Sequence, residues 1–389
     1  MTAKRALSRF RAPAERAAED RAWGVVQSAY QARAPFERRR SYRRRVGAVA
    51  VGIAVVGGVA LSPAGATVGR LITRALGVQH SSPALFSLPA PGHVLVSGPA
   101  GSWTVASDGA IRRIGRWPEA SWSPHGIYLA VAASGELAAV NRRGTVEWAL
   151  KHPHIRDPRW YPQSGCRVAY LSGSDLRVVA GDGTEDHLLA GRVAPVAPAW
   201  QPGSLLYPLA YVSSRGTIVV REGDTGQTIW TAKSGMVVKQ LVWSANGQRL
   251  LAVSSRAVAI YNGRGQLLAT HAAPGGAPIV DAALSPDARA LALVLGGSRG
   301  AVITESVAAR HQAVRRELSG MGLGQVAWSP DGRWLLVSWP AANQWVFIRV
   351  AGAPRISAVS RISQQFSPDI GSGFPRLEGW CCTVHGSAG

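Results

Sequence analysis

The sequence has 389 residues and a formal net charge of +21, with 47% apolar and 17% charged residues. This apolar content excludes a wholly disordered chain, and the length exceeds an ordinary compact domain unless the fold is repetitive. The charge suggests nucleic-acid binding. However, 39 of the 43 basic residues are arginines, a bias that we attribute to GC-rich coding, and we therefore expect no nucleic-acid partner. Three cysteines exclude a disulfide framework and a four-cysteine zinc site.

The basic residues are densest before residue 46. Residues 1–45 carry 13 basic and four acidic groups, and six arginines lie between residues 38 and 45. Within this segment, Trp23, Val26 and Tyr30 recur at helical spacing, and acidic residues lie early, where the helix dipole favours them. We expect a basic cytoplasmic segment with one short helix. That helix either docks onto a cytoplasmic partner or lies on the membrane beside the arginines.

An uncharged apolar stretch follows, from Val46 to Gly69. As a helix it would span about 36 Å, enough to cross a bilayer core of roughly 30 Å. The preceding arginines place the N-terminus in the cytoplasm and the rest of the chain outside. We therefore predict a single-pass signal anchor at residues 46–69 in the cytoplasmic membrane, followed by a juxtamembrane linker at residues 70–91. The alternative is a signal peptide cleaved after Ala66, although the long leader favours the anchor.

A repeat with a period near 40 residues occupies the remaining chain. Each copy has an aromatic or apolar residue, a tight turn rich in Pro, Asp, Asn and Gly, and then an apolar run. Four short strands fit in one period, which is the size of a propeller blade. The copies begin at Trp122, Trp160, Trp200, Trp243, Leu284 and Trp328.

The copy from Trp328 to Val337, which reads WSPDGRWLLV, carries a resemblance to a known family. It resembles the β-propeller repeat of the translocation protein TolB and its WD-repeat-like relatives. The Gly-His and Trp-Asp signatures of eukaryotic WD repeats are absent, so the partners of those proteins are not implied. The layout of basic leader, single span and repeat domain is similar to an actinobacterial envelope family. Neither resemblance implies an activity.

The ends of the repeat region predict how the ring closes. Three strands precede the first repeat and begin with Val94–Ser97, whereas the final strand, Pro375–Trp380, ends in Trp like the repeat strands and has no later partner. Pairing these two strands gives an all-β, seven-bladed propeller over residues 92–389, closed by its C-terminal strand. The strand before the closing one is expected at Ile356–Ile362. An irregular eighth unit at Phe366–Asp369 is the alternative.

Several short motifs resemble chemical sites, but none predicts a catalytic, cofactor or metal site. The string GGSRG at 296–300 matches a nucleophile elbow but lies between two expected antiparallel strands rather than in an α/β sheet. His152 and His154 suit a solvated loop better than a metal site, because no ligand cluster is nearby. Asp224–Trp230 resembles a quinoprotein repeat, but turn and packing roles explain its Gly and Trp.

The seven repeat positions, including Trp380, are expected to pack between blades. The outer arginines Arg112, Arg113, Arg315 and Arg316 are expected on a solvated rim, with contact to anionic lipid or wall polymer as the alternative. Cys381 and Cys382 are adjacent and form either a vicinal disulfide or free thiols. A bridge from either residue to Cys166 is not expected.

These features predict a membrane-anchored, extracytoplasmic scaffold that binds a protein or an envelope polymer. One alternative is a transmembrane sensor that signals through the helix around Trp23. Another is a lyase or lactonase-type enzyme, which is disfavoured because no acid, base or metal cluster converges. Such an enzyme would require a polar, metal-capable central channel.

Overall fold

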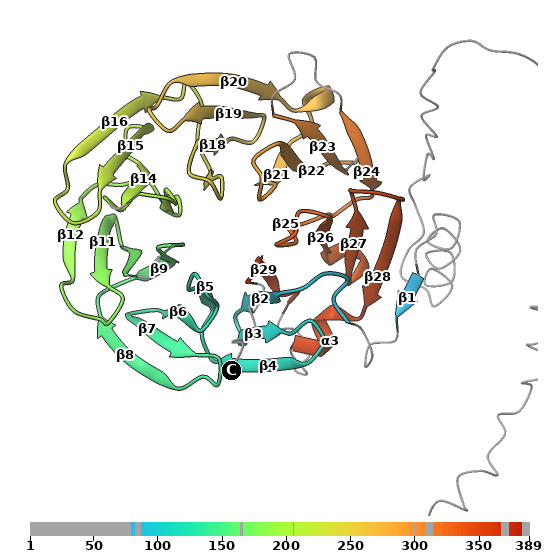
Figure 1. The fold of residues 1–389 in the computed structure, drawn as a ribbon, viewed down its shortest axis with the longest axis horizontal. Coiled ribbons are helices and arrows are strands. Elements are labelled where there is room, and N and C mark those ends of the chain that lie inside the picture. The colour runs from blue at the N-terminus through green and yellow to red at the C-terminus, as the bar shows by residue number, and fades with distance from the viewer. Residues whose placement is uncertain are drawn as a thin grey trace, which may run out of the picture. The chain divides into compact units, whose positions relative to one another are not determined.

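The computed structural model describes residues 79–81, 87–163, 166–204, 206–298, 300–307, 314–366 and 373–382. Seven β-sheets stand around a central axis and form a closed ring (Figure 1). The predicted cytoplasmic helix and the apolar stretch from Val46 to Gly69 lie outside the described residues. Within the described ranges, no helix has the length and apolar character needed to cross a membrane.

Each sheet contains one blade of four antiparallel strands, which run in order from the centre of the ring to its rim. Blade 1 contains β29 (Arg376–Cys381), β2 (His93–Gly98), β3 (Gly101–Val105) and β4 (Ile111–Gly115). Blade 2 contains β5 (Glu119–Trp122), β6 (Tyr128–Ala133), β7 (Glu136–Asn141) and β8 (Val146–Lys151). Blade 3 contains β9 (Ile155–Trp160), β10 (Arg167–Ser172), β11 (Asp175–Ala180) and β12 (His187–Ala190).

The other four blades follow in chain order. Blade 4 contains β13 (Ala199–Trp200), β14 (Pro208–Val212), β15 (Thr217–Glu222) and β16 (Thr228–Lys233). Blade 5 contains β17 (Gln240–Trp243), β18 (Arg249–Val253), β19 (Ala257–Asn262) and β20 (Leu267–Ala272). Blade 6 contains β21 (Ile279–Leu284), β22 (Ala290–Leu295), β23 (Ala301–Ser306) and β24 (Arg315–Ser319). Blade 7 contains β25 (Val326–Trp328), β26 (Trp334–Trp339), β27 (Gln344–Arg349) and β28 (Arg355–Ser360).

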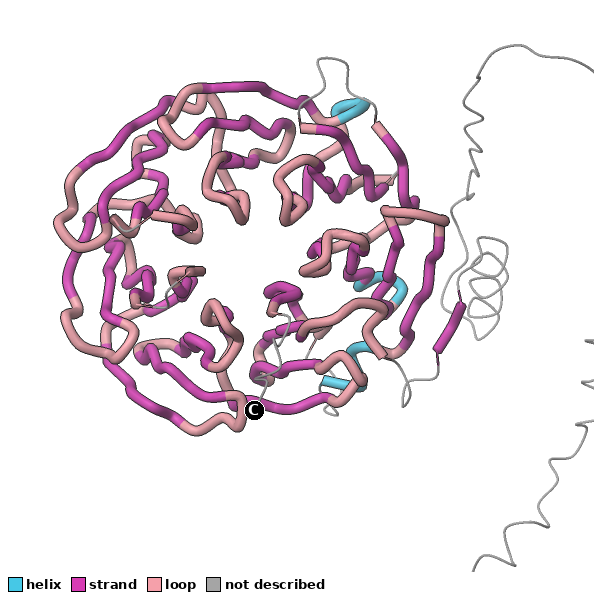
Figure 2. Tube along the Cα trace, viewed as in Figure 1, coloured by secondary structure: helices cyan, strands magenta, loops and turns pink. Residues whose placement is uncertain are grey.

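The predicted closure of the ring is confirmed. The chain's late strand β29 pairs antiparallel with β2, and Val94 faces Trp380 while Val96 faces Leu377. Figure 2 shows that this seam completes the circle of strands. The alternative, an irregular eighth unit at Phe366–Asp369, lies largely outside the described residues, and its first residue, Phe366, ends the short helix α3 (Ile362–Phe366).

Two further segments differ from the expected strand boundaries. The strand predicted at Ile356–Ile362 ends at Ser360, since Arg361 adopts a left-handed φ of 60° and turns the chain into α3. Upstream of residue 92, β1 (Gln79–Ser81) adds to the outer edge of blade 7 in parallel with β28. Leu88 and Ala90 are also buried, so packed structure begins within the range expected to be linker.

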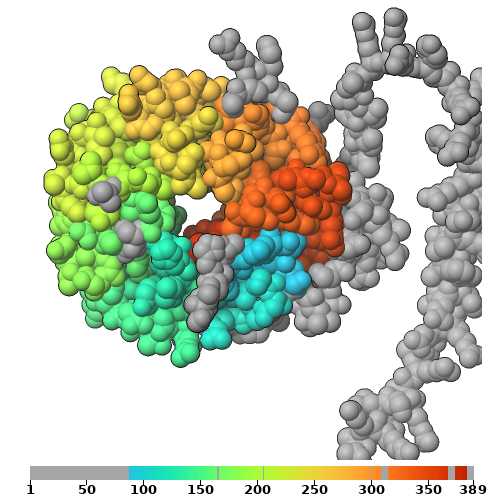
Figure 3. Space-filling view, viewed as in Figure 1, coloured from blue at the N-terminus to red at the C-terminus, as the bar shows by residue number. Residues whose placement is uncertain are grey.

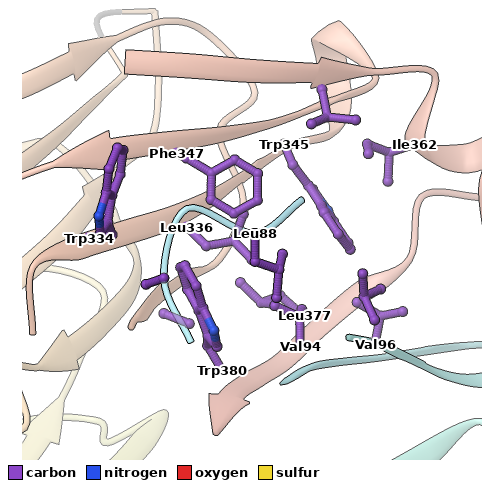
Figure 4. Close-up of a cluster of buried hydrophobic side chains, with 14 of the residues drawn as sticks. Leu88, Val94, Val96, Trp334, Leu336, Trp345, Phe347, Ile362, Leu377 and Trp380 are labelled. Carbon is purple, nitrogen blue, oxygen red and sulfur yellow. The ribbon is translucent and has the colours of Figure 1, made fainter. Parts of the chain in front are cut away.

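The hydrophobic core lies between neighbouring blades. The second and third strands of each blade are covered on both faces, so they read as continuous apolar runs, such as the buried Leu129–Ala132 in β6. At the closing seam the core includes Val94, Leu336, Phe347 and Trp380 (Figure 4). The rings of Phe347 and Trp380 meet edge to face with their centroids 5.8 Å apart. The seam between β29 and its neighbours is therefore part of a buried apolar cluster.

Candidate functional site

The centre of the ring is hollow. A cavity of about 600 Å³ opens along the axis, and Figure 3 shows its mouth on one face of the ring. Its wall is formed by the innermost strands of the blades together with the turns that follow them. Of the seven repeat positions, the structure brings Trp200, Trp243, Leu284, Trp328 and Trp380 to this wall.

These repeat residues belong to the blade packing more than to the cavity surface. Trp200, Trp328 and Trp380 are each more than nine-tenths buried, as are Trp160, Trp243 and Leu284, whereas Trp122 is half-buried. The indole of Trp200 donates to Arg159 O at 2.9 Å, and that of Trp328 donates to Ala283 O at 3.1 Å. Both acceptors lie on the preceding blade, so these indoles tie neighbouring blades together.

Six acidic and amide side chains of the wall belong to one repeated position or its substitute, a pattern that sequence reasoning missed. Three residues before the repeat aromatic or its Leu equivalent, five blades carry a carboxylate or an amide, and all five side chains line the cavity. In blade 1 the residue three before Trp380 is Leu377. The register between β2 and β29 shifts next to Leu95, and Glu378 is the polar residue that lines the cavity there. We call this set the polar girdle: Glu119, Asp157, Gln240, Asp281, Gln325 and Glu378.

Members of the polar girdle bind the backbone of the next blade. Glu119 accepts a hydrogen bond from the backbone N–H of Asp157. Asp281 Oδ2 accepts one from Val326 N at 2.9 Å, and Gln325 Oε1 accepts one from Leu377 N at 3.0 Å. Gln240 Nε2 donates to Ala282 O at 3.1 Å. The girdle therefore holds the innermost strands together, including β29.

Three carboxylates of the girdle, those of Glu119, Asp157 and Glu378, lie on one side of the cavity. Arg159 and Arg376 line the same cavity. Arg376 Nε is 2.6 Å from Glu378 Oε1, and the Ser97 hydroxyl also donates to Glu378. Burial raises the pKa of Glu119, and the neighbouring charges of Asp157 and Glu378 act in the same direction. Two of these carboxylates therefore have arginine partners, because Glu378 pairs with Arg376 and Asp157 Oδ2 lies 3.7 Å from Arg156 Nη1.

Asp281 lies on another part of the wall, between the main cavity and a smaller one of about 250 Å³ that Lys239 also lines. Burial raises its pKa to about 6, although hydrogen bonds from Val326, Ala282 and Gln240 favour the carboxylate. Asp281 therefore changes charge close to neutral pH, within the polar lining of the cavity.

The cavity can take a polar or cationic group, but its carboxylates are not arranged as metal ligands. Across the described ranges, no group of three or more His, Cys, Asp or Glu side chains could hold a metal ion. Most girdle side chains already hold a backbone partner. The wall is nevertheless polar. A polar wall is one of the two properties that the disfavoured enzyme alternative requires, and the capacity to hold a metal is the other.

The two histidines of the candidate metal motif have separate, structural environments. His152 Nε2 lies 2.8 Å from Asp186 Oδ2, and the Tyr170 hydroxyl and Arg177 bind the same carboxylate at 2.7 and 2.6 Å. This network ties the segment that precedes β12 to β10, β11 and the end of blade 2. His154 is exposed and has a left-handed backbone conformation. The structure does not bring the two histidines to one carboxylate.

The remaining motifs lie in turns and on the rim. Gly296 and Gly297 are in the turn between β22 and β23, and Asp224 precedes β16 and pairs with Arg167 at 2.6 Å. Trp230 is buried and donates to Gly263 O at 3.1 Å. The outer arginines lie exposed on β4 and β24: Arg112, Arg113, Arg315 and Arg316.

The two adjacent cysteines are joined in the structure. Cys381 is the last residue of β29 and forms a disulfide with Cys382, which contacts the turn of blade 2. Cys166 is exposed on the turn before β10 in blade 3. The pair therefore ends the closing strand rather than linking two blades.

No known family model matches the chain, and no curated protein matches it. Solved structures do. Hsv2 of Kluyveromyces lactis shares 16% identity, covering 69% of this chain and 94% of that one, with a TM-score of 0.51. A K. lactis Hsv2 variant with loop 6CD replaced by a Gly-Ser linker shares 16% identity and has a TM-score of 0.52. The similarity covers 69% of this chain and 93% of that one. A chain of the mitotic checkpoint complex shares 13% identity and has a TM-score of 0.51. The similarity covers 66% of this chain and 90% of that one.

At these identities the similarity shows the fold alone. The chain has a seven-bladed, WD-repeat-like β-propeller fold. This confirms the predicted fold of the repeat region and is compatible with protein binding. The closer kinship with TolB and the envelope family stays a prediction, as do the anchor and the side of the membrane.

Proposed function

We propose that this protein is a membrane-anchored, extracytoplasmic propeller that binds a protein or an envelope polymer at its central cavity. The observation that carries the proposal is the cavity of about 600 Å³ with its polar girdle. A rigid ring presents such a cavity together with the loops around its mouth, and both are common binding surfaces. The arginine-flanked apolar stretch from Val46 to Gly69 supports the anchor.

The orientation can be tested with Cys166, which is exposed on the propeller. A membrane-impermeant maleimide is added to intact cells, and labelling is measured by mass spectrometry. An extracytoplasmic propeller is labelled before lysis, and Cys166→Ser removes that label. If Cys166 is labelled only after the membrane is opened, the propeller lies on the cytoplasmic side and the proposed orientation is wrong.

The binding surface can be tested from Ala245, which lines the cavity and is exposed at its mouth. A photo-crosslinking amino acid is placed there in the full-length chain, and Ala272 on the outer strand β20 serves as the matched control. Irradiation of native membranes is expected to give a defined adduct from position 245 and none from position 272. Equal crosslinking at both positions would argue against the cavity as the binding surface.

A further inference from the structure

The turn after the repeat aromatic differs in blade 1. In the other six blades, this turn connects the innermost strand to the second strand. In five of them it carries proline two residues after the repeat position: Pro124, Pro162, Pro202, Pro286 and Pro330. Proline fixes φ and so limits the freedom of the turn. Blade 1 has Cys381 and Cys382 in the equivalent places, after Trp380.

The closing seam also lacks the covalent connection that the other blades have. The strands β29 and β2 come from distant parts of the chain, so no turn joins the end of β29 to its neighbour. Cys381 forms the last pair of this ladder, opposite His93. Strand ends without such a connection fray most readily. The conformation of the two cysteines therefore decides how firmly the end of β29 is held.

Cys382 is fitted against the neighbouring blade. Its sulfur lies 3.5 Å from Pro124 O in the turn of blade 2. A Cβ on Gly126 would lie 3.1 Å from both Cβ and Sγ of Cys382, so the glycine makes room for this contact. Cys382 has a φ of 63°, a conformation that an unconstrained L-residue disfavours. The disulfide restricts both residues to the small ring that contains their shared peptide bond.

We propose that Cys381 and Cys382 form a redox-modifiable site that controls the closing seam of the propeller. Oxidised, the pair holds Cys382 on the turn of blade 2 and takes the rigidifying role that proline has in five other blades. Reduced, Cys382 leaves the left-handed conformation more readily and the end of β29 loosens. Both cysteines are half-buried, so a small dithiol can reach them.

The chemistry is ordinary thiol–disulfide exchange. A thiolate of the dithiol attacks one sulfur of the pair, the bond between the two cysteines breaks, and a mixed disulfide forms. The second thiol of the reductant then displaces the cysteine and leaves as an oxidised disulfide. Two electrons and two protons pass to Cys381 and Cys382, which end as thiols.

The test uses the full-length protein in detergent, with and without dithiothreitol. Alkylation followed by mass spectrometry counts the thiols at 381 and 382. Hydrogen exchange is then followed in β2 and β29, with β14 in blade 4 as an internal reference. Reduction is expected to speed exchange in β2 and β29 but not in β14. It is also expected to lower the Tm by about 2–4 °C, a shift typical of a small loss of stability in a large domain.

Two variants make the result specific. Cys166→Ser is expected to respond to reductant as the wild type does. The double variant Cys381→Ser/Cys382→Ser is expected to start at the reduced Tm and to ignore reductant. If that variant does not fold, the wild-type comparison decides alone. Unchanged Tm and exchange after proven reduction would overturn the proposal, as would a pair already alkylated before reduction or resistant to dithiothreitol.

Discussion

Val94 lies opposite Trp380 where the first and last strands of the ring pair. Both side chains are buried in one cluster with residues of blade 7, so the seam joins chain segments that are nearly 290 residues apart in sequence. The ladder forms only when β29 is in place, and β29 contributes Leu377 and Trp380 to the cluster. This relationship makes the stability of the entire ring depend on a short C-terminal strand.

Removal of residues 375–389 is therefore expected to abolish the cooperative unfolding of the propeller, because it exposes both the edge of β2 and the apolar surface under Trp380. Thermal unfolding followed by near-ultraviolet circular dichroism measures this effect. A chain that ends at Cys382 keeps β29 and serves as the control, which is expected to melt close to the full-length protein. An unchanged melting curve for the larger deletion would contradict the role assigned to β29.

The second prediction concerns Asp281 and pH. Its pKa is raised to about 6 by burial, whereas an unfolded aspartate titrates near 3.8. Between these values the folded state holds the proton more strongly, so stability falls as pH rises from about 4 to above 6. Asp281→Asn keeps an acceptor for Val326 N and removes the buried charge. We expect this variant to gain roughly 1–3 kcal/mol over the wild type at pH 7.5.

Denaturant unfolding at pH 4 and pH 7.5 checks this prediction. Near pH 4 the wild-type carboxyl is largely protonated in the folded state, so the two proteins are expected to differ little. A gain at pH 4 equal to that at pH 7.5 would show that the amide acts through packing instead. If the unfolding free energy of the wild type instead rises between pH 4 and pH 6, with the same slope in Asp281→Asn, then other groups, and not Asp281, set the pH dependence of stability.

The third prediction concerns a buried pair between two blades. His271 Nδ1 on β20 lies 3.1 Å from Glu305 Oε1 on β23, and the two side chains are only 4% and 2% exposed. His271→Ala removes this buried polar contact and leaves a cavity, and it is expected to cost about 2–5 kcal/mol in unfolding free energy. Glu185→Ala removes an exposed partner of Arg167 and is expected to cost no more than about 1 kcal/mol. Similar losses in both variants would contradict the burial argument.

The fourth prediction separates backbone strain from contact between blades. Gly216 and Gly247 both have positive φ, 78° and 66°. A Cβ at Gly216 meets nothing within 4 Å, whereas one at Gly247 would lie 2.1 Å from Pro202 O in the turn of blade 4. Gly216→Ala is expected to cost about 1–2 kcal/mol from strain alone. Gly247→Ala is expected to cost a further 1–3 kcal/mol, approximately, from the forced shift of that turn. Equal urea midpoints for the two variants would disprove the contact.

The strands and the closure could be predicted because their causes are local and periodic. The Trp-Ser-Pro-Asp-Gly turn at Trp328 specifies a hairpin wherever it recurs, and an unpaired final strand has one open edge to join. The end of the strand at Ser360 could not be predicted, since it depends on a left-handed Arg361, and arginine carries no signal for that conformation. Packing around α3 and Asn343 supports that conformation, and such contacts are invisible in a linear pattern.

The polar girdle could have been found and was missed. Its position is constant relative to the repeat aromatic, but its chemistry varies between Glu119, Asp157, Gln240 and alanine at position 197, so no single residue type repeats. In blade 1 a shift of register moves the role to Glu378. Aligning the copies on the aromatic and asking only for a side chain that accepts hydrogen bonds would have shown the pattern.

The order of the strands along the chain has a consequence for biosynthesis. Because β29 completes the first blade and is translated after the other six blades, the ring stays open until the ribosome has made nearly all of it. During that time β2 presents an unsatisfied edge, the kind of surface to which another strand can add. Closure of the ring therefore comes only after all the other strands of the seven blades have been made.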